Sequence, residues 1–412
     1  MKRLALSLFL PVALTISLSI GYGKALPKLF LDPTLSATSI AFAYGGLIWV
    51  VPRQGGMAHP LITGHGNLRR PLYSPNGRYI AFTATYQGNT DVYVARADGA
   101  DVHRLTYYPS PNIAVGWTAN SRDVLFRSDR YGPHYIPRLF LVSRRGGFAH
   151  PLPLPTGQVG SFSPHDREIA YVPELQWERF WQHYEGGQKT TIRIAQLGTS
   201  RILVRIPHGP AEDRDPLWIG NHIFFLSNAA GQFTLYSYNV RNHRLRERLP
   251  VSRHHFDMLS AASGPGGIVL DRFGRIELYN LHTQRVRTIP IRLEGNIPDV
   301  RPRFVKAQPY LQNSAIDPRG DWVAFTAYGK LLELSVRHKG MVTLTHDGGE
   351  MVRDPAWSPR GSRIAYFSDK SGAYALYVRK ADGIGPVRVF SLGSRYDFYR
   401  HLRWSSSGNR LL

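Results

Sequence analysis

The sequence predicts an all-β protein, with one six-bladed β-propeller followed by the first blades of a second, incomplete β-propeller. Three observations predict this class. A strand–turn–strand motif recurs along the 412-residue chain, the composition includes 39 Gly, 29 Pro and 12% aromatic residues, and no stretch keeps a helical period over three turns. Short strands joined by tight turns explain all three observations.

The repeat is clearest in residues 71–94 and 355–378, which align without a gap. Each copy contains a Ser-Pro-x-Gly turn, in which proline fixes φ at the first corner and glycine accepts a positive φ. Alternating strand residues follow, then a second turn and another strand. Units of about 40–50 residues with about four strands are typical of propeller blades. Weaker copies lie at 115–130, 160–172, 216–240, 264–281 and 314–334, and a last copy begins at 402.

The repeat divides the chain into domains. We expect a six-bladed propeller over 26–291, a linker over 292–311, and the first two to three blades of a second propeller over 312–412. The last three residues occupy a position that lies inside a strand in the other copies. We therefore expect the second ring to be truncated and the chain to be part of a longer protein.

The N-terminal 25 residues are typical of an export signal. Lys2 and Arg3 precede an uncharged apolar stretch, 4–20, and small residues flank a cleavage point after Ala25. An uncleaved membrane anchor is the alternative, although Pro11 and several hydroxyl residues disfavour it. We expect the protein to be exported to the periplasm or outside the cell, with a membrane contact only if the signal stays uncleaved.

Composition excludes several classes of function. The chain has no cysteine, which excludes a disulfide scaffold, cysteine-based zinc sites and a cysteine nucleophile. The net charge is +22, but the basic residues are scattered and the densest run, 241–248, lacks a stacking platform for bases. We expect no nucleic-acid partner. A basic field that attracts acidic peptides is a better interpretation.

No catalytic motif is present. The sequence lacks a Gly-x-Ser-x-Gly elbow, a His-Glu-x-x-His pair and a phosphate-binding glycine loop. His254 and His255 precede Asp257, but adjacent strand residues point to opposite faces, so a polar turn explains them better than a metal site. We expect no catalytic residue, no metal and no cofactor in this chain.

The best candidate for recognition is an aromatic insertion at 177–187, which contains Trp181, His183 and Tyr184. Exposed aromatic residues in a loop on a rigid scaffold are typical of binding surfaces. The alternative is structural, with these rings filling a blade interface or the axis of the ring.

Segments 47–62, 88–111 and 354–378, together with the linker 290–306, resemble the N-terminal half of tricorn-type proteases. The resemblance runs from about Leu31 to the end of the chain. Blade motifs alone are shared with Tol-system propellers and prolyl-oligopeptidase relatives. The order of six blades, a Val-Arg-Pro-Arg linker and a second propeller is more specific, as is the sequence WQHYEGG.

This resemblance implies a six-bladed and a seven-bladed propeller ahead of a PDZ-like domain and a serine-protease core. It implies a large homo-oligomer that trims short peptides, with propellers that serve as passages. The catalytic residues of the family lie in a C-terminal half that has no counterpart here.

The resemblance also bears on the candidate site. Trp181 and Tyr184 match the family pattern WKxYRGG, whereas Gln182 and Glu185 replace its basic residues. Some tricorn proteases bind the terminal carboxylate of the substrate with an arginine pair after a strand of blade two, and the loop 107–112 has no arginine here. Either Arg127 or Arg130 supplies the charge, or this protein does not recognise that terminus.

We therefore expect the non-catalytic, substrate-gating portion of an exported tricorn-like serine peptidase, with peptides as partners. The alternative is a periplasmic propeller scaffold that binds partner proteins and has no enzyme activity.

Overall fold

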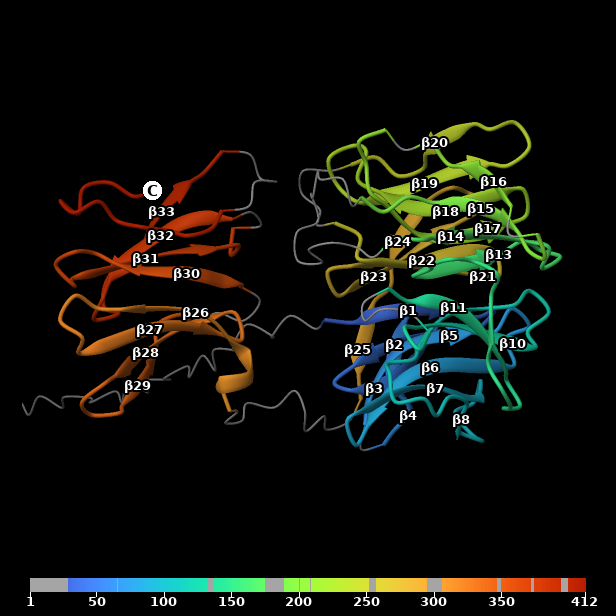
Figure 1. The fold of residues 1–412 in the computed structure, drawn as a ribbon, viewed down its shortest axis with the longest axis horizontal. Coiled ribbons are helices and arrows are strands. Elements are labelled where there is room, and N and C mark those ends of the chain that lie inside the picture. Colours follow the sequence, from blue (N-terminus) through green and yellow to red (C-terminus); the bar gives the residue numbers. More distant parts are fainter. Residues whose placement is uncertain are drawn as a thin grey trace, which may run out of the picture.

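The computed structural model describes residues 29–412 except 65, 132–135, 175–188, 200, 208, 252–256, 295–305, 347–349, 372–373 and 394–398. Within this part, the chain forms eight sheets, each built on four antiparallel strands that follow one another in sequence, and the first sheet gains a fifth, parallel strand from residues 291–293. Figure 1 shows six sheets in one group and two in another. The predicted all-β propeller architecture is confirmed, and each sheet is a blade.

The first three blades alternate strands with short turns. Blade one contains β1 (Leu31–Leu35), β2 (Ser39–Tyr44), β3 (Leu47–Pro52) and β4 (Gly56–Ile62). Blade two contains β5 (Asn67–Tyr73), β6 (Tyr79–Tyr86), β7 (Asn89–Arg96) and β8 (His103–Arg104). Blade three contains β9 (Ile113–Trp117), β10 (Asp123–Ser128), β11 (Arg138–Ser143) and β12 (His150–Pro151).

The next three blades have the same order. Blade four contains β13 (Val159–Phe162), β14 (Glu168–Val172), β15 (Arg193–Gln196) and β16 (Ile202–Arg205). Blade five contains β17 (Asp213–Ile219), β18 (His222–Ser227), β19 (Thr234–Asn239) and β20 (Leu245–Glu247). Blade six contains β21 (Ser260–Gly264), β22 (Gly267–Arg272), β23 (Arg275–Asn280) and β24 (Val286–Thr288).

A single hydroxyl group holds the hairpin between the first two strands of a blade. In blade two, Ser74 Oγ accepts the N–H of Tyr79 over 3.0 Å and donates to the carbonyl of the same residue. Gly77 closes the turn with φ of 69°, which glycine adopts without strain. The same bond to a residue five positions later is made by Thr118, Ser163, Ser358 and Ser405. This bond explains why the Ser-Pro-x-Gly turn recurs.

Burial of apolar faces between neighbouring blades stabilises the ring. In the described residues, six apolar clusters lie one at each interface of the first group of blades. Between blades two and three, for example, Ala81 and Val94 pack against Trp117 and Phe126. Removing such faces from water is the main favourable contribution to folding, so each blade is stable mainly through its two neighbours.

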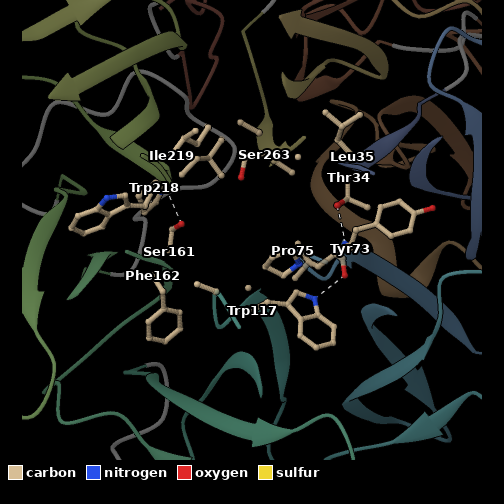
Figure 2. Close-up of a pocket in the computed structure, with 18 of the residues that line it drawn as sticks. Thr34, Leu35, Tyr73, Pro75, Trp117, Ser161, Phe162, Trp218, Ile219 and Ser263 are labelled. Carbon is tan, nitrogen blue, oxygen red and sulfur yellow. Dashed lines mark hydrogen bonds between the residues drawn. The ribbon is translucent and has the colours of Figure 1, made fainter. Parts of the chain in front are cut away.

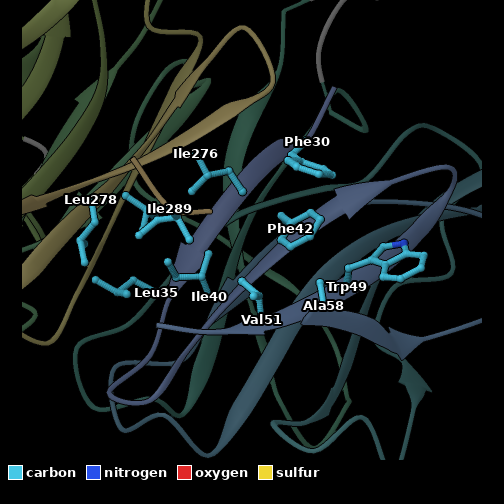
Figure 3. Packing of buried hydrophobic residues seen from close by; sticks show 11 residues of the cluster. Phe30, Leu35, Ile40, Phe42, Trp49, Val51, Ala58, Ile276, Leu278 and Ile289 are labelled. Carbon is cyan, nitrogen blue, oxygen red and sulfur yellow. The ribbon is translucent and has the colours of Figure 1, made fainter. Parts of the chain in front are cut away.

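The ring closes between blades six and one by the same kind of packing. Figure 3 shows Leu35 and Phe42 of blade one in one cluster with Ile276 and Leu278 of blade six. The chain then returns to the outer edge of blade one, where β25 (Ile291–Leu293) pairs in parallel with β4. The first sheet therefore has five strands, and blade six keeps four strands of its own. The predicted linker, 292–311, begins within β25 and ends at the first residue of β26.

The second group follows a short 3-10 helix, η2 (Gln308–Tyr310). Blade seven contains β26 (Leu311–Ile316), β27 (Trp322–Ala327), β28 (Lys330–Ser335) and β29 (Met341–Thr343). Blade eight contains β30 (Val352–Trp357), β31 (Arg363–Ser368), β32 (Ala375–Lys380) and β33 (Arg388–Ser391).

Beyond blade eight, Trp404 and Leu411 form a single bridge and pack on its open face. This is the place where the sequence predicts the start of another blade. Across the described chain, no helix has the length and apolar character needed to cross a bilayer.

Candidate functional site: the axial channel

The first strand of each of the six blades faces the axis of the ring, and together these strands surround a channel. Two cavities follow this channel and share Arg70, Val159 and Asp215 as lining residues. The larger cavity, about 600 Å³, is lined by the later residues of the inner strands and is called the wide chamber. The smaller cavity, about 220 Å³, is lined by their earlier residues and is called the polar mouth. The two cavities therefore lie in succession along the axis.

The wide chamber has a wall of backbone and small side chains. Gly116, Gly160, Ser161 and Ser263 line it from three different blades. In Figure 2, the rings of Trp117, Trp218, Phe162 and Tyr73 point away from the opening, toward the blades. The space for the chamber is thus made by small residues at the axis.

Close packing, within blade four and between the inner strands of blades three and four, explains the glycines. A Cβ atom on Gly160 would lie 2.8 Å from the Ile169 side chain, and one on Gly116 would lie 3.1 Å from the carbonyl of Gly160. Both indole N–H groups nearby have carbonyl acceptors, Leu72 for Trp117 and Gly220 for Trp218. The aromatic rings therefore support the wall from behind, and the N–H groups of these two indoles are satisfied.

The polar mouth contains the charged side chains of the channel. Its lining includes three acidic and three arginine residues, together with two hydroxyl groups and an amide: Asp32, Glu174 and Asp215; Arg70, Arg127 and Arg214; Thr190, Ser260 and Gln158. The lining is thus close to electrically neutral. Such a surface is complementary to a ligand that carries both signs of charge or a polar backbone.

Strained backbone positions three of these residues. Asp32, Arg70 and Asp215 have φ of 50°, 51° and 51°, and each precedes a proline in a bulge of its inner strand. The residue before proline normally adopts an extended conformation, so this geometry costs free energy. Bulges of this kind re-aim side chains, and here all three charged residues reach the same part of the axis.

Several charges of the mouth already have partners. Arg193 lies 2.5 Å from Glu174, and Arg127 donates to Gln158 over 2.9 Å. Arg214 donates to the carbonyl of Met258 over 2.5 Å and lies 3.7 Å from the centroid of the Phe233 ring. These contacts hold the arginine side chains in place at the wall.

Asp32 and Asp215 differ from Glu174, the third carboxylate of the mouth, which is paired with Arg193. Among the described residues, neither carboxylate has an ion pair within 4.0 Å. Burial raises the pKa of Asp215, and the negative charge of Asp32 adds to this effect, whereas Arg214 and Arg70 act in the opposite direction. Arg70 comes from blade two and Asp215 from blade five, so these two opposite charges interact electrostatically across the axis.

The structure distinguishes the two predicted arginines. Arg127 lines the polar mouth, whereas Arg130 lines neither cavity. The guanidinium of Arg130 lies 4.9–5.2 Å from the ring centroids of Tyr108, Phe126 and Phe140 and donates to Asn112 Oδ1 over 2.5 Å. These are contacts of a packing residue between blades two and three. Of the two, only Arg127 is placed to contact a ligand in the channel.

The arginine-free loop 107–112 is part of the same packing. Asn112 is fully buried and donates to Asp91 Oδ1 over 3.0 Å. Asp91 is also bonded to Arg104 and Thr106. This loop is therefore fixed by a buried polar network and adds no cation to the channel.

The aromatic candidates Trp181, His183 and Tyr184 lie outside the described residues. Glu174 and Thr190, which lie just before and just after that segment, both line the polar mouth.

In the described part of the chain, no three acidic or histidine side chains, those of the polar mouth included, lie close enough together to hold one metal ion. His254 and His255 lie outside the described residues. Asp257 accepts the N–H of Phe233 over 2.7 Å, which is a structural role in blade five.

Sequence reasoning missed Asp32, Arg70 and Asp215. A signal for them exists, because each stands before a proline at the same place in its repeat, and Asp354 before Pro355 repeats the pattern in blade eight with φ of 48°. Without a structure, these dipeptides are easily mistaken for turns.

Comparison with known proteins agrees with this architecture. The family described as the tricorn protease N-terminal β-propeller domain matches residues 27–285. Tricorn protease homolog 1 of Streptomyces coelicolor is 27% identical over 355 residues, which cover 84% of this chain and 33% of that protein. A tricorn protease homolog of Saccharolobus solfataricus is 23% identical over 341 residues, covering 81% of this chain and 31% of that protein. The chain thus spans about a third of the length of these relatives.

Among solved structures, the crystal structure of the tricorn protease is similar with a TM-score of 0.58 at 17% identity. The match covers 89% of this chain and 36% of that one, and it shows a shared fold. Since the family match covers more than half of the 412 residues, the chain belongs to the tricorn protease family through its N-terminal β-propeller domain.

Proposed function

We propose that this propeller portion of a tricorn-like protease gates short peptides through its axial channel and does no chemistry of its own. The observation that supports the proposal most directly is the channel, in which a chamber of about 600 Å³ adjoins a charged mouth. Ligand sites usually have volumes of about 300–1,000 Å³. An extended peptide is narrow and carries polar backbone and charged ends, and the two cavities offer surfaces for both.

Arg127 supplies a cation for the terminal carboxylate of a peptide. It is the member of the predicted arginine pair that lines the mouth, and Gln158 orients its guanidinium. A guanidinium binds a carboxylate with two parallel hydrogen bonds, which gives both strength and orientation. In this role Arg127 takes the place of the arginine pair that the loop 107–112 lacks.

Binding of defined tripeptides tests this function. The probes are acetyl-Leu-Leu-Phe with a free carboxylate and the same peptide with a C-terminal amide, titrated into the chain by calorimetry. We expect the free acid to bind about tenfold more tightly than the amide, because hydrogen bonds to charged groups contribute about 1.5–3 kcal/mol. Arg127→Met removes this difference, whereas Arg145→Met, at an exposed site of blade three, keeps it.

If neither peptide binds, the ring does not handle peptides, and the scaffold that docks partner proteins becomes the better hypothesis. If Arg127→Met binds both peptides as the wild type does, Arg127 is not the carboxylate contact.

We also propose that the protein is exported and that its full-length form is a homo-oligomer. The N-terminal 25 residues support export, and mass spectrometry of the secreted protein should find a chain that begins at Leu26. A chain that retains Met1 in the mature protein would contradict a cleaved signal. Light scattering on the full-length protein tests the homo-oligomer, and a monomeric mass would contradict it.

A further inference from the structure

We propose that Asp32 and Asp215 form a binding site for the α-ammonium group of a short peptide, at the junction of the polar mouth and the wide chamber. This proposal rests on the proposed peptide-handling function and adds recognition of the amino terminus, separate from the carboxylate contact at Arg127, with the residues that recognise it.

The two carboxylates are placed for a shared ligand. Both line the polar mouth, on inner strands of blades one and five, and both are turned to the axis by a bulge before a proline. Neither has an ion pair with a described side chain. Two like charges that are partly removed from water repel one another, and a cation between them relieves that repulsion.

Unsatisfied hydroxyl groups in the same cavity point to a hydrogen-bonding ligand. Thr190 is 3% exposed, and its Oγ1 has no hydrogen-bond partner among the described residues. Ser260 Oγ, on the inner strand of blade six, is also buried without a hydrogen-bond partner among the described residues. Both residues line the polar mouth. A buried hydroxyl without a partner costs free energy, which a ligand that donates hydrogen bonds would recover.

An ammonium group matches this set of acceptors. It has three N–H donors, and the mouth offers two carboxylates and two hydroxyl oxygens. A divalent metal ion fits less well, because it carries twice the charge of an ammonium group and is repelled correspondingly more strongly by Arg70 and Arg127 in the same cavity. The same arginines favour a ligand whose cation is followed by carbonyl oxygens, as in the first residue of a peptide.

The size of the mouth fits a peptide end. At about 220 Å³ it is smaller than a usual ligand pocket, and it opens into a chamber almost three times larger. A peptide held by its ammonium group at Asp32 and Asp215 can extend its following residues along the axis. The site thus selects for a free amino terminus without selecting strongly among side chains.

The test compares two peptides that lack a carboxylate, so that Arg127 contributes equally to both. Leu-Leu-Phe amide has a free amino terminus, and acetyl-Leu-Leu-Phe amide does not. We expect the purified chain to bind the first at least tenfold more tightly, as measured by calorimetry. Asp32→Asn and Asp215→Asn should each reduce the affinity for the free amine about tenfold and leave that for the acetylated peptide unchanged.

Asparagine is the right replacement because it also accepts a left-handed backbone, so that the bulge is kept and the charge removed. Asp354→Asn is the matched control, since Asp354 occupies the same bulge before a proline in blade eight, outside the channel. It should bind both peptides as the wild type does. Thermal melting of each variant confirms that it is folded.

The outcomes separate the two proposals. Equal affinity for the two peptides, or an equal effect of Asp354→Asn, overturns the ammonium site and leaves peptide handling intact. Equal loss of both peptides in Asp32→Asn and Asp215→Asn also overturns it, because the carboxylates then act on the shape of the channel. Absence of binding by either peptide overturns the peptide-handling function and the ammonium site with it.

Discussion

Trp117 of β9 donates from its indole Nε1 to the carbonyl oxygen of Leu72 in β5 over 2.9 Å, and this bond joins the inner strands of two neighbouring blades. The same bond recurs in the second group, where Trp357 and Trp404 each donate to an inner strand of the preceding blade over 3.1 Å. In all three cases the tryptophan precedes a serine or threonine, and its indole hydrogen bond links two neighbouring blades. We call this bond the inter-blade tie, and it adds to the packing of the apolar clusters.

Replacing Trp117 by phenylalanine should destabilise the ring by about 2–4 kcal/mol. The change leaves the Leu72 carbonyl without its donor and removes part of a buried ring, and each effect costs about 1–2 kcal/mol. Urea unfolding followed by circular dichroism measures the difference. Trp322→Phe is the control, since Trp322 is 36% exposed. An equal loss of unfolding free energy in the two variants would show that the hydrogen bond between Trp117 and Leu72 contributes nothing to stability.

The junction of β4 and β25 should tolerate no side chain at Gly55. A Cβ atom there would lie 2.6 Å from the carbonyl oxygen of Pro290, and the N–H of Gly56 donates to that same oxygen over 2.8 Å. We expect Gly55→Ala to cost at least about 2 kcal/mol, from the positive φ and the clash together.

Gly56→Ala is the matched control, because Gly56 also has a positive φ but open space around its Cβ position. Thermal melting compares the two variants. If Gly56→Ala lowers the melting temperature as much as Gly55→Ala does, the contact with Pro290 is unimportant and only backbone strain counts.

The stability of the ring should fall as the pH rises from about 4 to 7, because of Asp271 in blade six. Burial raises the pKa of this carboxyl to about 7, with a further increase from the charge of Asp32, although N–H groups of Gly274 and Asp32 bond to it. The folded protein therefore holds a proton that the unfolded chain releases near its ordinary pKa of 3.8. The loss is about 1.4 kcal/mol per pH unit within this window and is complete above pH 7.

Comparison of wild type with Asp271→Asn isolates this dependence. Urea unfolding between pH 4.5 and 8 should show the difference in unfolding free energy changing with pH up to 7 and remaining constant above it. Glu333 of blade seven also has a pKa raised by burial to about 7, but it is present in both proteins, so its effect cancels. Parallel pH profiles for the two proteins would contradict the assignment to Asp271.

Arg130→Met should destabilise the ring by about 2–4 kcal/mol. The substitution removes a charged hydrogen bond to Asn112 and cation–π contacts with three rings, and it leaves the buried amide oxygen without a donor. Arg145→Met, at an exposed position, should change stability by less than about 0.5 kcal/mol. A cost for Arg130→Met as small as that of the control would show that Arg130 is not a packing residue.

The blades could be predicted from the sequence because each repeats a local signal. The hydroxyl of Ser74 and the glycine at 77 define the first hairpin, and their equivalents recur at a regular interval. The closure of the ring could not be predicted in the same way. Strand β25 has three residues and pairs in parallel with β4, which lies more than 200 residues earlier in the sequence. No local pattern encodes that pairing.

The candidate site was only partly predictable for a similar reason. The resemblance predicts a cation near blade two and offers Arg127 and Arg130 alike, because nothing in the sequence around them separates the two. The difference lies in what surrounds each side chain, the open mouth for Arg127 and three rings for Arg130. Asp32 and Asp215 acquire their role only when the six inner strands meet at one axis.

The closure of the ring between blades six and one determines where the chain could be circularly permuted. The four antiparallel strands of every blade form one continuous segment, and only β25 joins blade one from elsewhere, so new termini between β8 and β9 would leave each sheet whole. The original ends, β1 and β25, lie at opposite edges of the same sheet, which four strand spacings make about 19 Å wide. A connecting peptide of about six or more extended residues would span that width. Circular permutation of the ring is therefore feasible at the boundaries between blades, provided that β25 stays with β4.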